Sequence, residues 1–237
     1  SIIDKDGTVV ARRFIDSAAE KDHLYRVLNQ IKKAQSVGNR KTPKLWRYAN
    51  NYNSQISVNA AKGIHDFALE YGCDVIVMEH LDIQGKKKGS KKQRLHLWRK
   101  REIQRTVESL AHRSGMRYST VLASRTSQLA FDGTGKVKRS DKNYSLCVFP
   151  SGKQYNCDLN ASYNIGSRYF LRYYSKTIPE KVWLDIQAKV PECSKRTNST
   201  LSTLSRVSAE LQAVLAEFRA HTRTVERNSL LPKGEND

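Results

Sequence analysis

The segment from Cys157 to Gly166 reads CDLNASYNIG and places an aspartate directly before a run of small and amide residues typical of a helix start. Asp158 has two candidate tasks there. As an N-cap, its carboxylate would accept hydrogen bonds from the free N–H groups of the first helical turn. As a metal ligand, the same carboxylate would bind a hard divalent cation through its oxygens. One residue can do both, so the rest of the chain has to indicate whether a metal is involved.

The chain carries a large excess of positive charge. Its 237 residues contain 42 Lys and Arg against 23 Asp and Glu, a formal net charge of +19. Such an imbalance destabilises a compact state by self-repulsion unless a polyanion screens it, so nucleic acid is the expected partner. No run of about 18 apolar residues and no secretory signal is visible, which argues against a membrane. Four scattered cysteines without a Cys-x-x-Cys pair indicate a reducing, cytosolic setting.

Outward from the quoted segment, strands and helices alternate. The expected elements, in chain order, are a hairpin over residues 1–15, helices over 16–35 and 44–71, a strand over 74–78, a helix carrying residues 97–111, a strand over 118–122, an irregular hairpin over 129–156 and a helix ending near 174. The strand over 74–78 (DVIVM) is a continuous apolar run, as expected of a strand covered on both faces, and Glu79 follows it. This alternation predicts an α/β domain with a mixed sheet flanked by helices.

The composition changes beyond Pro191. A Ser/Thr-rich stretch leads into a short amphipathic helix expected over 207–219, and the last stretch from Asn228 is expected to be disordered. Residues 175–237 therefore form a predicted helical C-terminal extension with a disordered tail.

Glu79 and Asp158 are the acids that this architecture displays best, because α/β folds bind ligands at the carboxyl ends of their strands. Taken singly, each is weak evidence, because an acid at such a position is a loop or cap residue in most proteins. In a basic chain they suggest a shared task, since two divalent cations held by carboxylates can align water and leaving oxygen in phosphodiester hydrolysis. Magnesium prefers such hard oxygen ligands.

The runs VIVMEHL (75–81) and DLNASYNI (158–165) resemble the second and third motifs of the RuvC-like nuclease domain of transposon-encoded TnpB proteins and related type V CRISPR effectors. The resemblance covers about residues 1–174. It implies an RNase H-like (RuvC) fold, RNA-guided cutting of DNA, Mg²⁺ (or Mn²⁺) as cofactor, and guide RNA and target DNA as partners in a prokaryotic cytosol or nucleoid. Carried over, Glu79 and Asp158 would be catalytic metal ligands.

The sequence departs from the family pattern at its start. The family's first aspartate lies on a first strand before the hairpin, and that strand is absent from this chain. In the family's sheet this strand is central, so its loss leaves buried backbone groups unpaired. We therefore expect the native protein to extend upstream, and the 237 residues alone neither to cut DNA nor to fold well.

A second departure concerns zinc. The family often carries two Cys-x-x-Cys pairs between the second and third motifs, whereas here residues 129–132 read LAFD. The segment 129–156 is thus interpreted as a degenerate zinc-finger-like hairpin insertion, with no zinc expected. Side-chain packing would have to hold it, with the candidates Phe131, Tyr144, Leu146, Phe149 and Tyr155.

Basic residues are the candidates for contact with nucleic acid. They are Lys86, Lys87, Lys88, Lys91, Lys92 and Arg94 in one loop, and Arg125, which precedes the hairpin insertion. A solvated loop is the alternative for the lysine run. The aromatic residues Trp46, Tyr48, Tyr52 and Trp98 either stack on bases or belong to the core. His80 either orients a substrate or lies on the surface.

Three functions remain open on these grounds. The first is an RNA-guided, metal-dependent DNA endonuclease. The second is a nuclease-dead relative that binds guide and DNA as a repressor or recruitment module. The third is a guide-free resolvase or transposase of the same fold. An upstream aspartate in the first motif would favour cutting, and copurifying RNA would disfavour the third function.

Overall fold

The computed structural model describes residues 1–39, 41–80, 99–141 and 143–229, with side chains as far as residue 217. The chain divides into two compact units. The α1–α4 unit consists of Ile2 and Arg12–Thr120, and the α5–α7 unit of Ser1, Ile3–Ala11 and Val121–Asp237.

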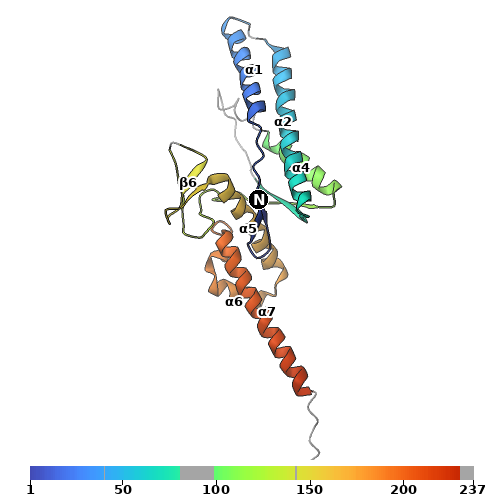
Figure 1. Ribbon diagram of the computed structural model, residues 1–237, viewed down its shortest axis with the longest axis vertical. Coiled ribbons are helices and arrows are strands. Elements are labelled where there is room, and N and C mark those ends of the chain that lie inside the picture. Colours follow the sequence, from blue (N-terminus) through green and yellow to red (C-terminus); the bar gives the residue numbers. More distant parts are fainter. Residues whose placement is uncertain (40, 81–98, 142, 230–237) are drawn as a thin grey trace, which may run out of the picture. The chain divides into compact units, whose positions relative to one another are not determined.

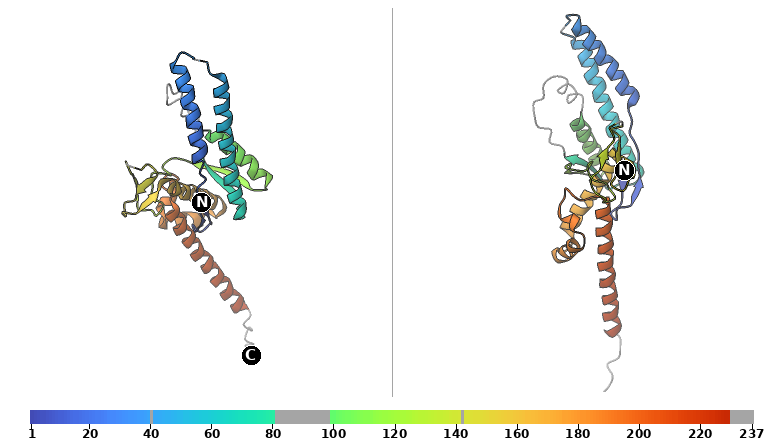
Figure 2. Two further views of the ribbon diagram at one scale, coloured as in Figure 1. Left: turned by 45° about the horizontal axis from the view of Figure 1, so that its top comes forward. Right: turned by 90° about the vertical axis from the view of Figure 1, so that its left-hand side faces the viewer.

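Two long helices dominate the α1–α4 unit. Helix α1 (Ala18–Ser36) and helix α2 (Pro43–Glu70) lie side by side as a helical hairpin (Figures 1 and 2). The apolar residues at helical spacing meet along the shared face, which confirms the helices expected from the sequence. The buried members are Leu24, Val27, Leu28, Ile31 and Ala49, with Leu45, Trp46, Tyr52 and Ile56 packed against them.

A second core in this unit joins helices to strands. Strand β3 (Val75–His80) pairs with β4 (Arg117–Leu122), and helix α4 (Lys100–Arg113) connects them along the chain. Small residues let the helices approach closely. The buried members of this core are Ala61, Ala68, Ile76, Val107, Ala111 and Met116.

Glycines with a left-handed backbone follow the C-caps of α2 and α4. Gly72 has φ +61°, the left-handed conformation that costs glycine no Cβ clash. Its N–H donates to Leu69 O, and the Cys73 N–H donates to Ala68 O, both at 3.0 Å. These two bonds satisfy carbonyls that the end of α2 would otherwise leave free, and so they set where β3 can begin.

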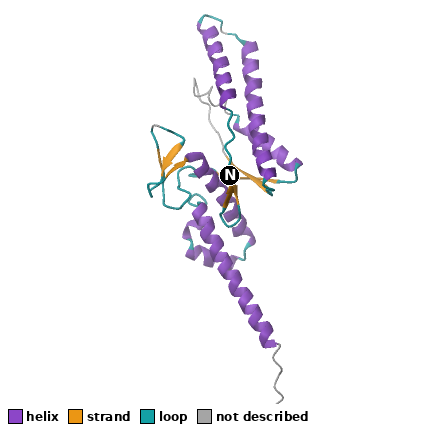
Figure 3. Ribbon diagram, viewed as in Figure 1, coloured by secondary structure: helices purple, strands orange, loops and turns teal. Residues whose placement is uncertain are grey.

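The described strands form three small sheets (Figure 3, orange). Strands β1 (Ile2–Ile3) and β2 (Val9–Ala11) form the hairpin expected at the start of the chain, and the Asp4 N–H donates to Thr8 O at 2.9 Å. The α/β character expected from the sequence is confirmed at this level. The single mixed sheet of an RNase H-like fold stays a prediction.

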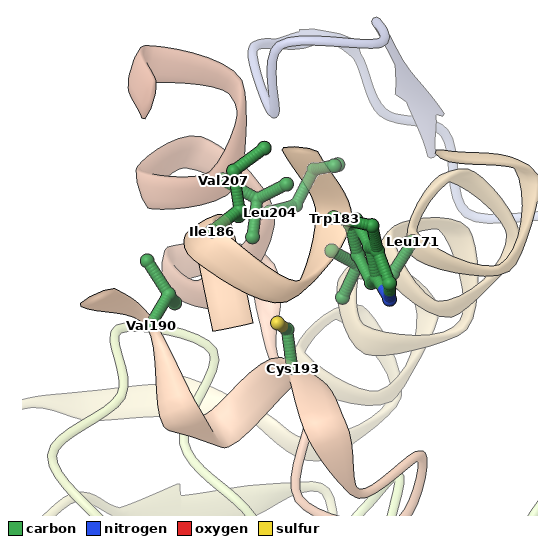
Figure 4. Packing of buried hydrophobic residues seen from close by; sticks show 7 residues of the cluster. All are labelled: Leu171, Trp183, Ile186, Val190, Cys193, Leu204 and Val207. Carbon is green, nitrogen blue, oxygen red and sulfur yellow. The ribbon is translucent and has the colours of Figure 1, made fainter. Parts of the chain in front are cut away.

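Helices make up most of the α5–α7 unit. They are α5 (Cys157–Thr177), α6 (Glu180–Lys189), the short 3₁₀ helix η1 (Pro191–Ser194) and α7 (Leu201–Ser229). Their buried core is drawn in Figure 4 and consists of Leu171, Trp183, Ile186, Val190, Cys193, Leu204 and Val207. Trp183 from α6 fills the space beside Leu171 of α5, so the extension expected after residue 174 packs on the helix that carries Asp158.

Helix α7 corrects two expectations for the C-terminal stretch. It begins at Leu201 and not at 207, and it includes Asn228, which we expected in the disordered tail. At its start, the hydroxyl of Thr203 accepts the Thr200 N–H at 3.2 Å. Ser/Thr-rich composition suggested a non-helical stretch, but these hydroxyls satisfy backbone donors of the first turn. The burial of Leu204 then favours the earlier start.

The hairpin insertion is a small antiparallel sheet of β5 (Lys138–Arg139), β6 (Leu146–Val148) and β7 (Gln154–Asn156). Its core consists of Ala130, Val137, Cys147, Phe149 and Cys157, with Phe131 and Tyr155 packed against them. The ring of Phe131 lies edge-on to Phe149 and to Tyr155, with centroids 5.4 Å and 5.0 Å apart. Packing by these three rings is thereby confirmed.

Tyr144 was a wrong candidate for this core. Its side chain is 76% exposed, because the residue lies in the turn that leads into β6. Leu146 is half-buried. The expectation that no zinc binds to the insertion stays a prediction.

Cys147 has a pKa raised to about 11, first because it is buried and second because it hydrogen-bonds the Cys157 thiol. In the unfolded chain this thiol loses its proton near 9, so the folded state binds more protons between about pH 9 and 11. The free energy of unfolding is therefore expected to fall with rising pH in this window, by at most about 1.4 kcal/mol per pH unit from this group.

Urea unfolding at pH 8 and pH 10 of the wild type and of Cys147→Ala measures this contribution. Lysines and tyrosines titrate in the same range in both proteins, so only the difference between them belongs to Cys147. If the free energy of unfolding of Cys147→Ala fell as much between pH 8 and pH 10 as that of the wild type, the raised pKa of Cys147 would be contradicted.

Candidate active site

Asp158 lies in the first turn of α5, and its neighbour Asn156 is the N-cap. The Asn156 side-chain oxygen accepts the N–H groups of Asp158 and Leu159 at 2.9 and 3.0 Å. The N-cap interpretation of Asp158 is therefore wrong: an extended backbone at Asn156 (φ −73°, ψ 129°) places that side chain where the cap is needed. The exposed carboxylate of Asp158 is left available for a ligand at the positive end of the helix dipole.

Two buried amides on α5 bind the loop before the hairpin insertion. Asn160 donates to Leu129 O at 2.8 Å and accepts the Phe131 N–H at 2.8 Å. Asn164, one turn later, donates to the carbonyls of Thr126 and Leu129, both at 2.9 Å. Both amides are fully buried. They satisfy backbone groups of the loop that would otherwise be buried without a hydrogen-bond partner.

Arg168 continues this row by one further turn. Its Nη1 donates to the carbonyls of Leu122 and Ser124, both at 2.7 Å, and its Nη2 donates to Thr197 O at 3.0 Å. The side chain is only 5% exposed. The planar guanidinium thus holds the end of β4 and the turn between η1 and α7 onto α5. Sequence reasoning missed this row, although the spacing of 160, 164 and 168 marks one face of a helix.

Arg125 lies at the tip of the loop that α5 holds. Among the described residues, Arg125 is the non-glycine residue that has a left-handed backbone, with φ +63°. Such a conformation persists only where the surroundings hold it, and here the carbonyls of Ser124 and Thr126 on either side bind Arg168 and Asn164. The Arg125 side chain is exposed, and its Nη1 lies 3.5 Å from Asn198 Oδ1. This loop presents a cation in the same unit as Asp158.

Glu79 lies inside β3 as its second-last residue, and not after the strand as we expected. Its Oε2 lies 3.0 Å from Lys100 Nζ, and its backbone carbonyl accepts Gln104 Nε2 at 2.7 Å. Both partners lie on α4, one turn apart, whereas the strand itself pairs with β4. His80 ends the strand with its side chain exposed, in agreement with the surface interpretation.

Among the remaining candidates, Trp46 and Tyr52 belong to the core, Tyr48 is exposed, and the others lie outside the described residues. Trp46 and Tyr52 pack on the α1–α2 core, as ordinary core aromatics do. Tyr48 is exposed, stacks on Tyr52 with ring centroids 6.0 Å apart, and bonds His23. The candidates Lys86, Lys87, Lys88, Lys91, Lys92, Arg94 and Trp98 lie outside the described residues.

The donors present suit a hard divalent cation. Among the described residues no group of three His, Cys, Asp or Glu side chains gathers at one point. Of the two candidate ligands, Glu79 belongs to the α1–α4 unit and Asp158 to the α5–α7 unit. At Glu79 the Lys100 ammonium already acts as a stand-in cation. Carboxylate oxygens at Glu79 and Asp158 fit Mg²⁺ or Mn²⁺ better than a soft metal.

Comparison with known proteins supports the sequence resemblance. No protein-family model matches the chain. A TnpB-like protein of Aquifex aeolicus (strain VF5) is 28% identical over 159 residues, which cover 61% of this chain and 51% of the relative. The chain thus spans about half the length of this curated relative.

A solved structure shares the fold. The matching chain, from the cryo-EM structure of the Cas12f1–sgRNA–target DNA complex, aligns with a TM-score of 0.51 and 18% identity over 66% of this chain and 44% of that chain. The two findings confirm that the chain is similar to TnpB-like proteins and to a type V CRISPR effector. None of the helices among the described residues is long and apolar enough to cross a membrane.

Proposed function

We propose that this chain is part of an RNA-guided DNA endonuclease of TnpB type, which hydrolyses phosphodiesters with divalent metal ions. The similarity to a TnpB-like protein over 159 residues carries the proposal, together with the glutamate and aspartate motifs that resemble those of this family. The net charge of +19 supports polyanionic partners. Guide RNA and target DNA are named by the Cas12f1 complex and are proposed here for this chain.

In this proposal the carboxylates of Glu79 and Asp158 would be metal ligands, as the resemblance implies. When bound, the metal ions neutralise charge on the phosphate and activate the attacking water. The protein's own residues supply the geometry. Asn156 fixes the start of α5 and thereby the backbone of Asp158, and Gln104 fixes the backbone of Glu79.

Arg125 is proposed to contact the nucleic-acid backbone. Its guanidinium is exposed on a loop whose carbonyls are bound from both sides, so the side chain is presented from a rigid base. An arginine fork matches the geometry of a phosphate group. The basic candidates between Lys86 and Arg94 are proposed for the same task.

A reconstitution experiment tests the proposal. The protein is expressed with its upstream sequence and its native locus, purified with any bound RNA, and offered duplex DNA that matches the RNA. We expect cutting in Mg²⁺ or Mn²⁺ and none in EDTA. Binding of RNA and DNA without cutting would favour the nuclease-dead alternative, and cutting without copurified RNA would favour the guide-free one.

A further inference from the structure

Lys100 gives the Glu79 carboxylate a cation of its own. The two side chains are 15% and 22% exposed, and their charged atoms lie 3.0 Å apart. A charged group that is partly removed from water is stabilised by an oppositely charged partner at this distance. Lys100 is the first residue of α4, and Gln104 on the next turn binds the backbone of the same glutamate. The first turns of α4 therefore contact the end of β3 at Glu79.

We propose that Lys100 is a positioning residue that competes with the divalent metal for Glu79. Resting on the function proposed above, the inference assigns to Lys100 the control of how much metal the nuclease needs. A bound Mg²⁺ lies about 2.1 Å from its carboxylate oxygen. An ammonium hydrogen-bonded to the same carboxylate would then lie within a few ångströms of the metal, where like charges repel.

Two consequences follow for the protein without and with metal. Without metal, the Lys100 ammonium pairs with the Glu79 carboxylate and holds it in place at the end of β3. With metal, Lys100 has to move away from the carboxylate or share it. Breaking the ion pair costs free energy, and this cost reduces the net free energy of metal binding. Lys100 therefore weakens metal binding while it preserves the shape of the site.

A neighbouring ion pair provides a matched control. Arg99 Nη1 lies 2.8 Å from Glu102 Oε2, and Glu102 also accepts the hydroxyl of Ser54 on α2. This pair is partly buried like that of Lys100, but it lies at the start of α4 and does not involve Glu79. Arg99→Met should lower stability without changing metal affinity.

The experiment measures Mn²⁺ binding by electron paramagnetic resonance of free Mn²⁺, with the upstream-extended protein and its bound RNA. Lys100→Met removes the charge and keeps much of the length of the side chain. We expect a dissociation constant roughly three- to tenfold lower than that of the wild type, by the ion-pair energies usual for partly buried pairs. Lys100→Arg should stay close to the wild type, and Glu79→Gln should bind more weakly.

A second measurement needs no substitution. Acetylation of lysines in the wild type, followed by mass spectrometry, reports how accessible each ammonium is. Saturating Mn²⁺ should increase the modification of Lys100 several-fold and leave the exposed Lys176 unchanged. Unchanged Lys100 reactivity, or a Lys100→Met variant with unaltered or weaker Mn²⁺ affinity, would overturn the competition. Absence of DNA cutting under every metal would overturn the proposed function instead.

Discussion

Replacing Asp158 or Glu79 with alanine is expected to reduce DNA cutting by the RNA-bound, upstream-extended protein at least ~10²-fold. Each carboxylate is proposed to hold a metal ion that neutralises developing charge, and the loss of several kcal/mol of such stabilisation corresponds to this factor or more. Initial rates at saturating Mg²⁺ measure the effect. Controls are Glu108→Ala on α4 and Asp185→Ala on α6, both exposed carboxylates, for which the rate should change less than about threefold.

The structure separates this effect from simple damage to α5. Because Asn156 is the N-cap, Asn156→Ala should lower the free energy of unfolding by about 1 kcal/mol. Asp158→Asn should lower it by less than 1 kcal/mol, since only a favourable charge near the helix dipole is lost, and yet should abolish cutting. If Asp158→Asn kept near-normal rates, or lost activity only in proportion to its stability, the metal-ligand assignment would be wrong.

Replacing Arg168 with alanine is expected to destabilise the protein by about 3 kcal/mol or more, because a buried charged donor is lost and its acceptors remain. The acceptors are the carbonyls of Leu122, Ser124 and Thr197. Arg168→Lys should recover only part of the loss, because an ammonium cannot reproduce the planar fork. Urea unfolding followed by circular dichroism measures both variants.

Lys176→Ala is the matched control for Arg168, since it removes a cation from an exposed position on the same helix. Its free energy of unfolding should change by less than about 0.5 kcal/mol. An Arg168→Ala variant as stable as this control would show that the three carbonyls find other partners, and the row of polar residues on α5 would lose its assigned task.

Local sequence predicted the elements well where a residue type strongly favours one backbone conformation. Gly72 ends α2 because only glycine takes φ +61° without a Cβ clash. The apolar run over 75–78 forms β3, although the strand extends through Glu79 to His80. The partners of Glu79, Lys100 and Gln104, come from a helix some twenty residues later, which local sequence does not reveal.

The start of α5 shows where local sequence leaves a choice. Asn156 and Asp158 are both good N-caps, and they stand only two residues apart. Pairing of β6 with β7 through Asn156 fixes its extended backbone, and this tertiary constraint selects the asparagine. The aspartate then stays available, which its sequence position alone did not reveal.

The sequence by itself determined the charge, the order of most elements and the two acids, because periodicity, glycine positions and short motifs act over a few residues. Only the tertiary structure decided what those acids and their helices contact. Asn160, Asn164 and Arg168 were not singled out from the sequence, and they are buried against loop carbonyls. Lys100 was not singled out either, and it is paired with Glu79. Burial and pairing depend on segments far apart in the chain, and a polar residue looks the same in sequence whether water or a carbonyl satisfies it.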